Sequence, residues 1–234
     1  MCEPLMSQPS RRVFLRQALA AGAALALPLP PALARSTAPL VTPDQALHLL
    51  KEGNARFLAE RPLHPNMTIG RLRETFAEGQ HPFATILGCS DSRVPVELIF
   101  DRGIGDIFSV RVAGNVASHD EIASIEYGVE HRHAPLLVVL GHTHCGAVKH
   151  ILDGEKMDIH VQILLDNIVP AAMRAKARGL TGEALWNSAV RENVLQSMAD
   201  CRRRSVPLRD LERAGRVRIV GAVYHTESGV VEWI

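Results

Sequence analysis

The feature of this sequence that most constrains its fold is a set of short apolar runs separated by segments with helical periodicity. The apolar runs cover residues 83–89, 106–112, 136–141 and 217–224. Contiguous apolar residues over so short a length are typical of strands that are buried on both faces of a sheet. The sequence therefore predicts an α/β fold, with a central, mainly parallel β-sheet flanked by helices.

Helices are expected on both sides of the first strand. Residues 42–59 and 68–78 predict an N-terminal helical arm, in which Thr42 is a suitable N-cap and Pro43 suits the first helical position. Further helices are expected at residues 122–131, 146–152, 159–176 and 185–204. No internal repeat or low-complexity segment interrupts this pattern, so residues 35–234 are expected to form one domain.

The first residues have the anatomy of an export signal. A twin-arginine stretch at residues 10–16 precedes an apolar run at residues 18–29 and the small-residue site Ala32-Leu33-Ala34. That run is too short to span a bilayer, and it ends in prolines. Residues 1–34 are therefore predicted to be a Tat signal peptide that engages the Tat export machinery, and the mature protein is predicted to be periplasmic or otherwise exported.

Composition excludes several classes of partner. The chain has 234 residues, a formal net charge of +1 and only 4% aromatic residues, so neither charge nor stacking favours nucleic acid. No other segment is apolar for long enough to insert stably in a membrane, and the mature product is expected to be soluble. Signal cleavage would remove Cys2 and leave Cys89, Cys145 and Cys201, an odd number that argues against a disulfide framework.

Two of the predicted strands end in polar motifs of the same kind. The first ends as Gly88-Cys89-Ser90-Asp91-Ser92-Arg93, and the third as Gly141-His142-Thr143-His144-Cys145-Gly146. Ligands of open α/β sheets bind beyond the carboxyl ends of the strands. Two thiolates and one imidazole suit zinc, and three protein ligands leave the fourth position that a catalytic zinc needs. A lone buried cysteine is usually a core residue, but two half-sites at equivalent strand ends predict a metal centre.

These motifs carry a resemblance to a known family. Residues 89–93, taken with His142-x-x-Cys145, resemble the signature of the β-carbonic anhydrases. The similarity continues through residues 111–115, 124–127 and 221–224, and it covers the chain from about Thr42 onward. The resemblance implies reversible hydration of carbon dioxide to bicarbonate, one Zn²⁺ per chain, and a homodimer or higher homo-oligomer.

The resemblance also implies roles for individual residues. Cys89, His142 and Cys145 would be the zinc ligands, and Asp91 and Arg93 would form a catalytic dyad beside the metal. Asp91 is also a conditional fourth ligand, because in some family members this aspartate moves onto zinc and closes the site. A carboxylate paired with arginine stays ionised, which independently suits it to accept a hydrogen bond from water.

The remaining implied residues concern the substrate, which is small and apolar and needs a mostly apolar pocket. By similarity, the substrate-binding residues would be Gln80, Val94, Phe108, Tyr127 and Gly146. Gln80 matches a glutamine that reaches the substrate across a dimer interface; otherwise it is a surface loop residue. Ile86 stands where a second branch of the family has a tryptophan, so regulation by bicarbonate of that branch's kind is not expected.

Two other functions fit the same residues. One is hydrolysis of carbon disulfide or carbonyl sulfide, which some relatives of this fold perform. The other is a non-catalytic zinc-binding protein whose site is closed by Asp91. A structural site needs none of Arg93, Gln80, Phe108 and Tyr127. His144 is either an aid to proton transfer or an exposed turn residue, and Cys201 is a packed or surface thiol rather than a ligand.

Overall fold

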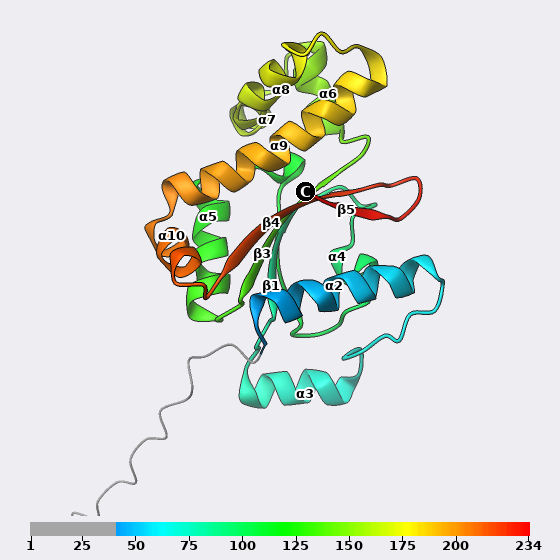
Figure 1. The fold of residues 1–234 in the computed structure, drawn as a ribbon, viewed down its shortest axis with the longest axis vertical. Helices are drawn as coiled ribbons and strands as arrows, with labels where there is room; N and C mark the ends of the chain where they lie inside the picture. Colours follow the sequence, from blue (N-terminus) through cyan, green and yellow to red (C-terminus); the bar gives the residue numbers. More distant parts are fainter. Residues whose placement is uncertain (1–40) are drawn as a thin grey trace, which may run out of the picture. The chain divides into compact units, whose positions relative to one another are not determined.

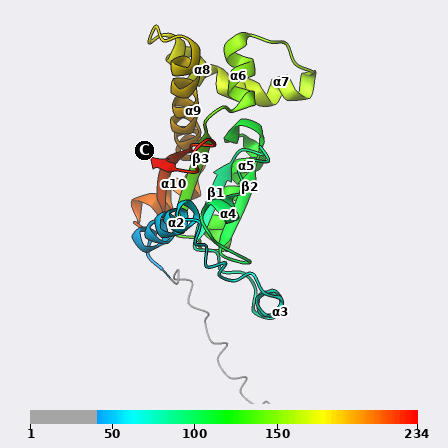
Figure 2. The same ribbon diagram turned by 90° about the vertical axis from the view of Figure 1, so that its right-hand side faces the viewer.

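The structure is a computed structural model in which residues 41–234 are described (Figures 1 and 2). The predicted signal peptide lies outside the described residues. The expected sheet is confirmed, with five strands in the order β2-β1-β3-β4-β5. The strands are β1 (Ala84–Gly88), β2 (Ile107–Arg111), β3 (Leu136–His142), β4 (Arg218–Tyr224) and β5 (Val231–Trp233). The first four are mutually parallel, and β5 is antiparallel to β4.

The strand order places a topological switch between β1 and β3. After β1 the chain moves to one side to form β2, and it then returns to the other side of β1 to form β3. The two strands are in direct register, with Gly88 opposite Leu140. A crevice is expected between two neighbouring parallel strands when the chain leaves them toward opposite sides of the sheet. The chain goes from β1 to β2 on one side and from β3 to β4 on the other, and the two polar motifs directly follow β1 and β3.

Helices cover both faces of the sheet (Figures 1 and 2). The side chains of β3 alternate between two core clusters: Leu137 and Val139 belong to one, and Val138 and Leu140 to the other. The first cluster includes α5 (His119–Glu126) and α9 (Gly182–Arg204), and the second includes α2 (Pro43–Leu58) and α4 (Val96–Ile99). Burial on both faces accounts for the continuous apolar character of the strand.

Some predicted helices are interrupted. The segment expected at residues 159–176 is divided into α7 (Ile159–Leu165), a 3₁₀ turn (Asp166–Ile168) and α8 (Val169–Lys176). Pro170 lacks a backbone N–H and suits the first turn of α8, where none is needed. The segment expected at residues 122–131 is α5 followed by a π-helical turn (Tyr127–His131). The predicted helix α6 (Gly146–Asp153) is present. Within residues 41–234, the helices α4 and α10 (Val206–Arg213) and a 3₁₀ turn (Ala113–Asn115) were not predicted.

The N-terminal arm is confirmed. Thr42 caps α2 in a reciprocal pair of hydrogen bonds with Gln45. On the buried side of α2, Asn54 donates to the carbonyls of Ile99 and Gly229, at 3.2 and 3.0 Å, and accepts from the Val231 N–H at 3.1 Å. This one side chain therefore connects α2 with α4 and with the β4–β5 hairpin.

The second helix of the arm, α3 (Ile69–Glu78), has a different environment. None of its residues is buried, and Phe76 is 92% exposed. Arg71 holds the helix to the domain by donating to the Ile104 carbonyl at 3.0 Å. The apolar side of α3 is therefore left uncovered by the rest of residues 41–234. Among residues 41–234, no helix is both long and apolar enough to cross a bilayer.

Candidate metal centre

Cys89, His142 and Cys145 come together at the switch point. Their sulfur and imidazole donor atoms all lie within 4.8 Å of one another, and all three residues are buried. Cys89 directly follows β1, His142 is the last residue of β3, and Cys145 is the N-cap of α6. The two polar motifs of the sequence are thus two halves of one cluster, held by adjacent strands.

The His142 ring is oriented for metal binding. Its Nδ1 lies 2.9 Å from the Thr143 carbonyl oxygen, which can only accept, so Nδ1 carries the proton and Nε2 keeps its lone pair. Nε2 is buried and has no hydrogen-bond partner among residues 41–234. A buried polar atom without a partner is costly, and a metal ion bound at Nε2 would satisfy it. The residues present therefore fit a metal ion.

The two cysteines form a coupled pair. A hydrogen bond with Cys145, together with contacts from His142 and from the backbone N–H groups of Asp91 and Gly114, lowers the pKa of Cys89 to about 4, although burial opposes this. The same hydrogen bond, together with burial, raises the pKa of Cys145. Without a metal ion the pair is a thiolate beside a thiol, and metal binding would release the second proton.

Residues that sequence reasoning missed hold the first half of the cluster. Arg111 donates to the carbonyls of Cys89 and Asp91, at 3.0 and 2.7 Å. Gly114 donates its N–H to Cys89 Sγ at 3.3 Å, and Asn193 on α9 fixes this glycine by donating to its carbonyl at 2.7 Å. Arg111 and Gly114 lie in the stretch that resembles the family, whereas nothing in the sequence marked Asn193.

Asp91 and Arg93 form the predicted pair. Arg93 donates from Nε to Asp91 Oδ1 at 3.0 Å and from Nη2 to Oδ2 at 2.7 Å. These hydrogen bonds lower the pKa of Asp91 to about 2. The Asp91 Oδ2 atom lies 3.9 Å from His142 Nε2, so an ionised acceptor borders the donor atoms of the cluster.

The predicted substrate residues have mixed locations. The rings of Phe108 and Tyr127 contact each other with centroids 5.9 Å apart, and Tyr127 is 45% exposed. Gly146 is exposed at the start of α6. Val94 is fully buried in the core cluster that includes α2 and α4, so its side chain has a packing role there.

Gln80 is not part of this chain's own cluster. It is exposed and follows α3, at the amino end of β1, whereas Cys89 follows the carboxyl end of the same strand. Five strand residues separate the two ends, which corresponds to about 17 Å. Any contact between Gln80 and a metal centre would therefore involve the centre of another chain.

Cys201 and His144 are also placed by the structure. Cys201 is fully buried in the core cluster with α9, and burial raises the pKa of its thiol to about 12. Of the two alternatives, a packed thiol or a surface thiol, Cys201 is therefore the packed thiol. The side chain of His144 is 42% exposed in the turn between the two ligand candidates of the second motif, and its Nε2 lies 3.8 Å from Glu183 Oε1.

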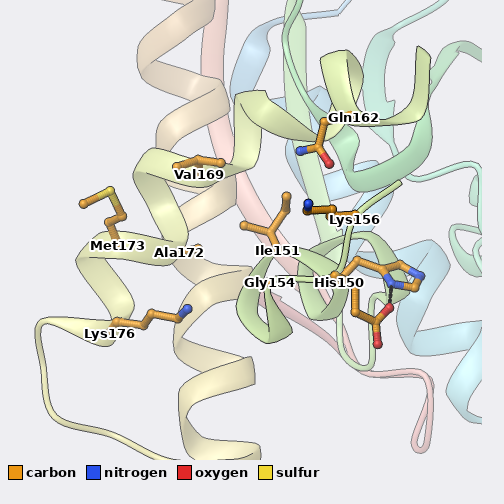
Figure 3. A pocket seen from close by; sticks show the side chains of 10 residues that line it. His150, Ile151, Gly154, Lys156, Gln162, Val169, Ala172, Met173 and Lys176 are labelled. Carbon is orange, nitrogen blue, oxygen red and sulfur yellow. Dashed lines mark hydrogen bonds and ion pairs between the residues drawn. The ribbon is translucent and has the colours of Figure 1, made fainter. Parts of the chain in front are cut away.

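A separate cavity of about 290 Å³ lies against α6, α7 and α8 (Figure 3). Apolar side chains of Ile151, Val169 and Met173 line it together with Lys156 and Lys176. None of the cluster residues takes part in its lining. This cavity is therefore distinct from the candidate metal centre.

Fold and cluster together define a doubly wound α/β protein with a Cys₂His cluster at its switch point that could hold a metal ion. The sequence profile described as carbonic anhydrase matches residues 84–231. The chain is 39% identical to a carbonic anhydrase of Mycolicibacterium smegmatis over 198 residues, which is 83% of this chain and 94% of the relative. This chain therefore belongs to the β-class carbonic anhydrase family and is an enzyme of that family.

Other relatives agree. Carbonic anhydrase 2 of Mycobacterium tuberculosis is 39% identical over 196 residues, covering 82% of this chain and 92% of the relative. The solved structure of the β-carbonic anhydrase CcaA superposes with a TM-score of 0.62 at 26% identity, over 82% of this chain and 89% of that chain. A tetrameric β-carbonic anhydrase of Sordaria macrospora shares the fold with a TM-score of 0.63 at 21% identity, over 81% of this chain and 97% of that chain.

Proposed function

We propose that this protein catalyses the reversible hydration of carbon dioxide to bicarbonate and a proton, with one Zn²⁺ held by Cys89, His142 and Cys145. The observation that carries this proposal is the convergence of three buried donor atoms, one of which, His142 Nε2, has no hydrogen-bond partner among residues 41–234. Two sulfurs and one imidazole nitrogen match zinc, and three ligands leave a position for a small molecule.

Zinc held there supplies a Lewis acid that makes a bound water molecule a nucleophile near neutral pH. The residues of the chain provide the rest. Asp91 is kept ionised by Arg93, so it can accept a hydrogen bond from the attacking water and orient it toward the carbon of the substrate. The exposed ring of Tyr127 and the neighbouring ring of Phe108 offer an apolar surface. Carbon dioxide is small and apolar, so it can leave water for this surface at little cost in its own hydration free energy.

The alternative position of Asp91, as a fourth zinc ligand, remains part of the proposal. In this structure the carboxylate is paired with Arg93, which is the arrangement expected for an open site. Its Oδ2 atom is 3.9 Å from His142 Nε2, so a change of side-chain rotamer would bring it into competition with water. Arg93 thus supports the open state by offering the carboxylate a second partner.

The proposed assembly is a homodimer or a higher homo-oligomer. Gln80 lies at the opposite end of β1 from the metal centre of its own chain, and the exposed apolar face of α3 directly precedes it. A second chain that covered α3 could receive Gln80 at its own centre. The Sordaria macrospora relative is tetrameric, which supports assembly of this kind.

Export is also a proposal. Residues 10–34 have the order of a Tat signal, with paired arginines, an apolar run and a small-residue cleavage site. We infer a periplasmic mature protein that starts after Ala34. Folding and metal loading before export would shield Cys89 and Cys145 from oxidation, which is a physical reason for a pathway that carries folded proteins.

Stopped-flow measurement of carbon dioxide hydration by the mature protein, before and after removal of metal by a chelator, tests the activity. The expected result is rapid hydration that is lost with the metal and restored by zinc. Parallel assays with carbon disulfide and carbonyl sulfide separate the hydrolase alternative, because that enzyme would turn over these substrates and leave carbon dioxide unchanged. Full zinc content without any turnover would support the non-catalytic alternative.

A further inference from the structure

The turn between His142 and Cys145 is contacted by a tryptophan that neither the motifs nor the mechanism uses. Trp186, on α9, donates its indole N–H to the Cys145 carbonyl oxygen at 3.1 Å. Its ring also contacts the His144 ring edge to face, with centroids 4.9 Å apart and an interplanar angle of 85°. One side chain thus touches two consecutive residues of the second half of the metal centre.

This turn needs external support because of its backbone conformation. His144 has a φ of 55°, in the left-handed region that side chains other than glycine rarely adopt. Two further contacts hold the turn: Arg93 Nη2 donates to the His144 carbonyl at 3.2 Å, and the Thr226 N–H donates to Thr143 Oγ1 at 2.9 Å. Trp186 is the one of these partners that reaches Cys145 itself.

We propose that Trp186 is a positioning residue for the metal centre, which keeps the strained His144–Cys145 backbone in the shape that directs the Cys145 thiolate and the His142 ring at one metal ion. This inference rests on the zinc binding proposed above. Side chains that hold a ligand in place typically change metal affinity or activity by about 10- to 100-fold when they are removed. The indole N–H would act in this way through the ligand's own backbone.

The surroundings of Trp186 favour a positioning role over simple core packing. The residue is only partly buried, and its ring borders a cavity of about 380 Å³ that His144, Leu152 and Leu185 also line. A large ring beside open space gives less packing stability than a fully enclosed one. Its directed contacts include the hydrogen bond to Cys145 and the edge-to-face contact with His144, and the Lys149 ammonium lies 5.8 Å from the ring centroid.

The chain contains two tryptophans, and the second supplies a matched control. Trp233 lies on β5, and its ring packs against Phe100 with centroids 6.1 Å apart, away from the cluster residues. Trp186→Phe keeps an aromatic ring and removes the N–H donor, and Trp233→Phe makes the same chemical change elsewhere. The zinc-loaded variants and the wild-type protein would be mixed with a chromophoric chelator, and the rate of zinc release measured.

We expect Trp186→Phe to release zinc at least about 10-fold faster than the wild-type protein, and Trp233→Phe to release it at the wild-type rate. The melting temperatures of the metal-free proteins separate positioning from stability. In the metal-free state, Trp186→Phe should melt no lower than Trp233→Phe. A loss of metal-free stability in Trp186→Phe that accounts for the faster release would show a structural role and overturn the inference.

A second measurement needs no variant at the site. With ¹⁵N-labelled indoles, the wild-type spectrum contains two indole N–H signals, which the Trp233→Phe spectrum assigns. Addition of Zn²⁺ to the metal-free protein should shift the Trp186 signal and leave the Trp233 signal in place. An unshifted Trp186 signal in a protein that binds zinc would overturn this inference alone. A wild-type protein that binds no zinc would instead overturn the proposed function on which the inference rests.

Discussion

The guanidinium of Arg93 binds the carboxylate of Asp91 through two roughly parallel hydrogen bonds, and the same group also donates to the carbonyl of His144. Arg93 therefore joins the loop after β1 to the turn after β3, which are the two halves of the metal centre. The pairing lowers the pKa of Asp91 to about 2. The folded-state pKa lies below the ordinary value of 3.8, so the pairing stabilises the folded state at pH values above 3.8. This stabilisation is lost as the pH falls toward 2.

Replacement of Arg93 by alanine should lower carbon dioxide hydration by about 100-fold at every pH, since the aligned acceptor is lost and Asp91 is free to close the site. Zinc content should stay near the wild-type value, because the three primary ligands are unchanged. Arg191→Ala is a suitable control: Arg191 forms an exposed ion pair with Glu232, and its loss should cost at most about 1 kcal/mol of stability and no activity.

X-ray absorption at acid and alkaline pH checks the geometry behind this prediction. Closure by Asp91 adds a carboxylate carbon shell around zinc, and Arg93→Ala should show that shell over a wider pH range than the wild-type protein. Identical spectra of the two proteins at both pH values, with activity still reduced, would rule out the switch and leave only the loss of water orientation.

Each predicted zinc ligand should be necessary. Cys89→Ala, His142→Ala and Cys145→Ala should each lose most of the bound zinc and all measurable activity, with metal content measured by mass spectrometry. Cys201→Ala is the matched control, because this cysteine is equally buried but is not one of the three converging donors. A ligand variant that kept full zinc and full activity would remove that residue from the centre.

The role of Gln80 can be tested by complementation between chains. Gln80→Leu alone and Cys89→Ala alone should both be inactive or nearly so. When the two variants are co-expressed in equal amounts, some dimers should contain one chain of each kind. In such a mixed dimer, one centre has both its metal and an intact Gln80 from the partner chain. If dimers form at random, about a quarter of the wild-type number of sites should be restored. Gln162→Leu, a change of the same kind on α7, should keep full activity. Absence of restored activity in confirmed mixed dimers would contradict a contribution across the interface.

The thiols should differ in reactivity. The thiol of Cys201 has a pKa of about 12, so it stays protonated and unreactive at a pH of about 8. Cys89, whose pKa is about 4, is a thiolate at that pH. Mass spectrometry after iodoacetamide treatment should show modification of Cys89 in the metal-free protein, protection by zinc, and no modification of Cys201 until the protein is denatured.

Export should depend on the paired arginines outside the described residues. The double variant Arg11→Lys and Arg12→Lys should accumulate in the cytoplasm as uncleaved precursor, seen by cell fractionation. The same change at Arg203 and Arg204, on α9, should leave export normal. Wild-type levels of the first double variant in the periplasm would refute the Tat assignment.

The sequence was most informative where burial on two faces leaves a simple pattern. The runs that became β1, β3 and β4 are nearly continuous in apolar residues, and they were predicted. Strand β5 was not among the predicted runs, because it has three residues and one of them, Glu232, is exposed. The π-helical turn was also missed. It brings Gly128 so close to β1 that an added Cβ would lie 2.5 Å from Thr85 Oγ1, a tertiary contact that no local pattern encodes.

The candidate site shows the same contrast between residues that a local sequence pattern predicts and residues that only tertiary contacts identify. The convergence of Cys89, His142 and Cys145 could be predicted because candidate metal ligands are of few residue types and these three stand at strand ends. The residues that hold them are ordinary in type: Asn193 and Trp186 are polar or aromatic positions on a long helix, and their roles come from hydrogen bonds to backbone carbonyls. Any segment presents such carbonyls, so only the folded arrangement identifies these partners.

Asn54 also bears on how the chain is completed during synthesis. Its partners Gly229 and Val231 lie 175 and 177 positions further along the chain. A ribosome delivers α2 long before the β4–β5 hairpin, so the amide of Asn54 stays without these partners until the hairpin has been synthesised. A chain cut after β4 would lack two of the three hydrogen bonds of Asn54, and the edge of β4 would be open to other strands. Gly229 and Val231 thus complete the attachment of the first described helix to the rest of the domain.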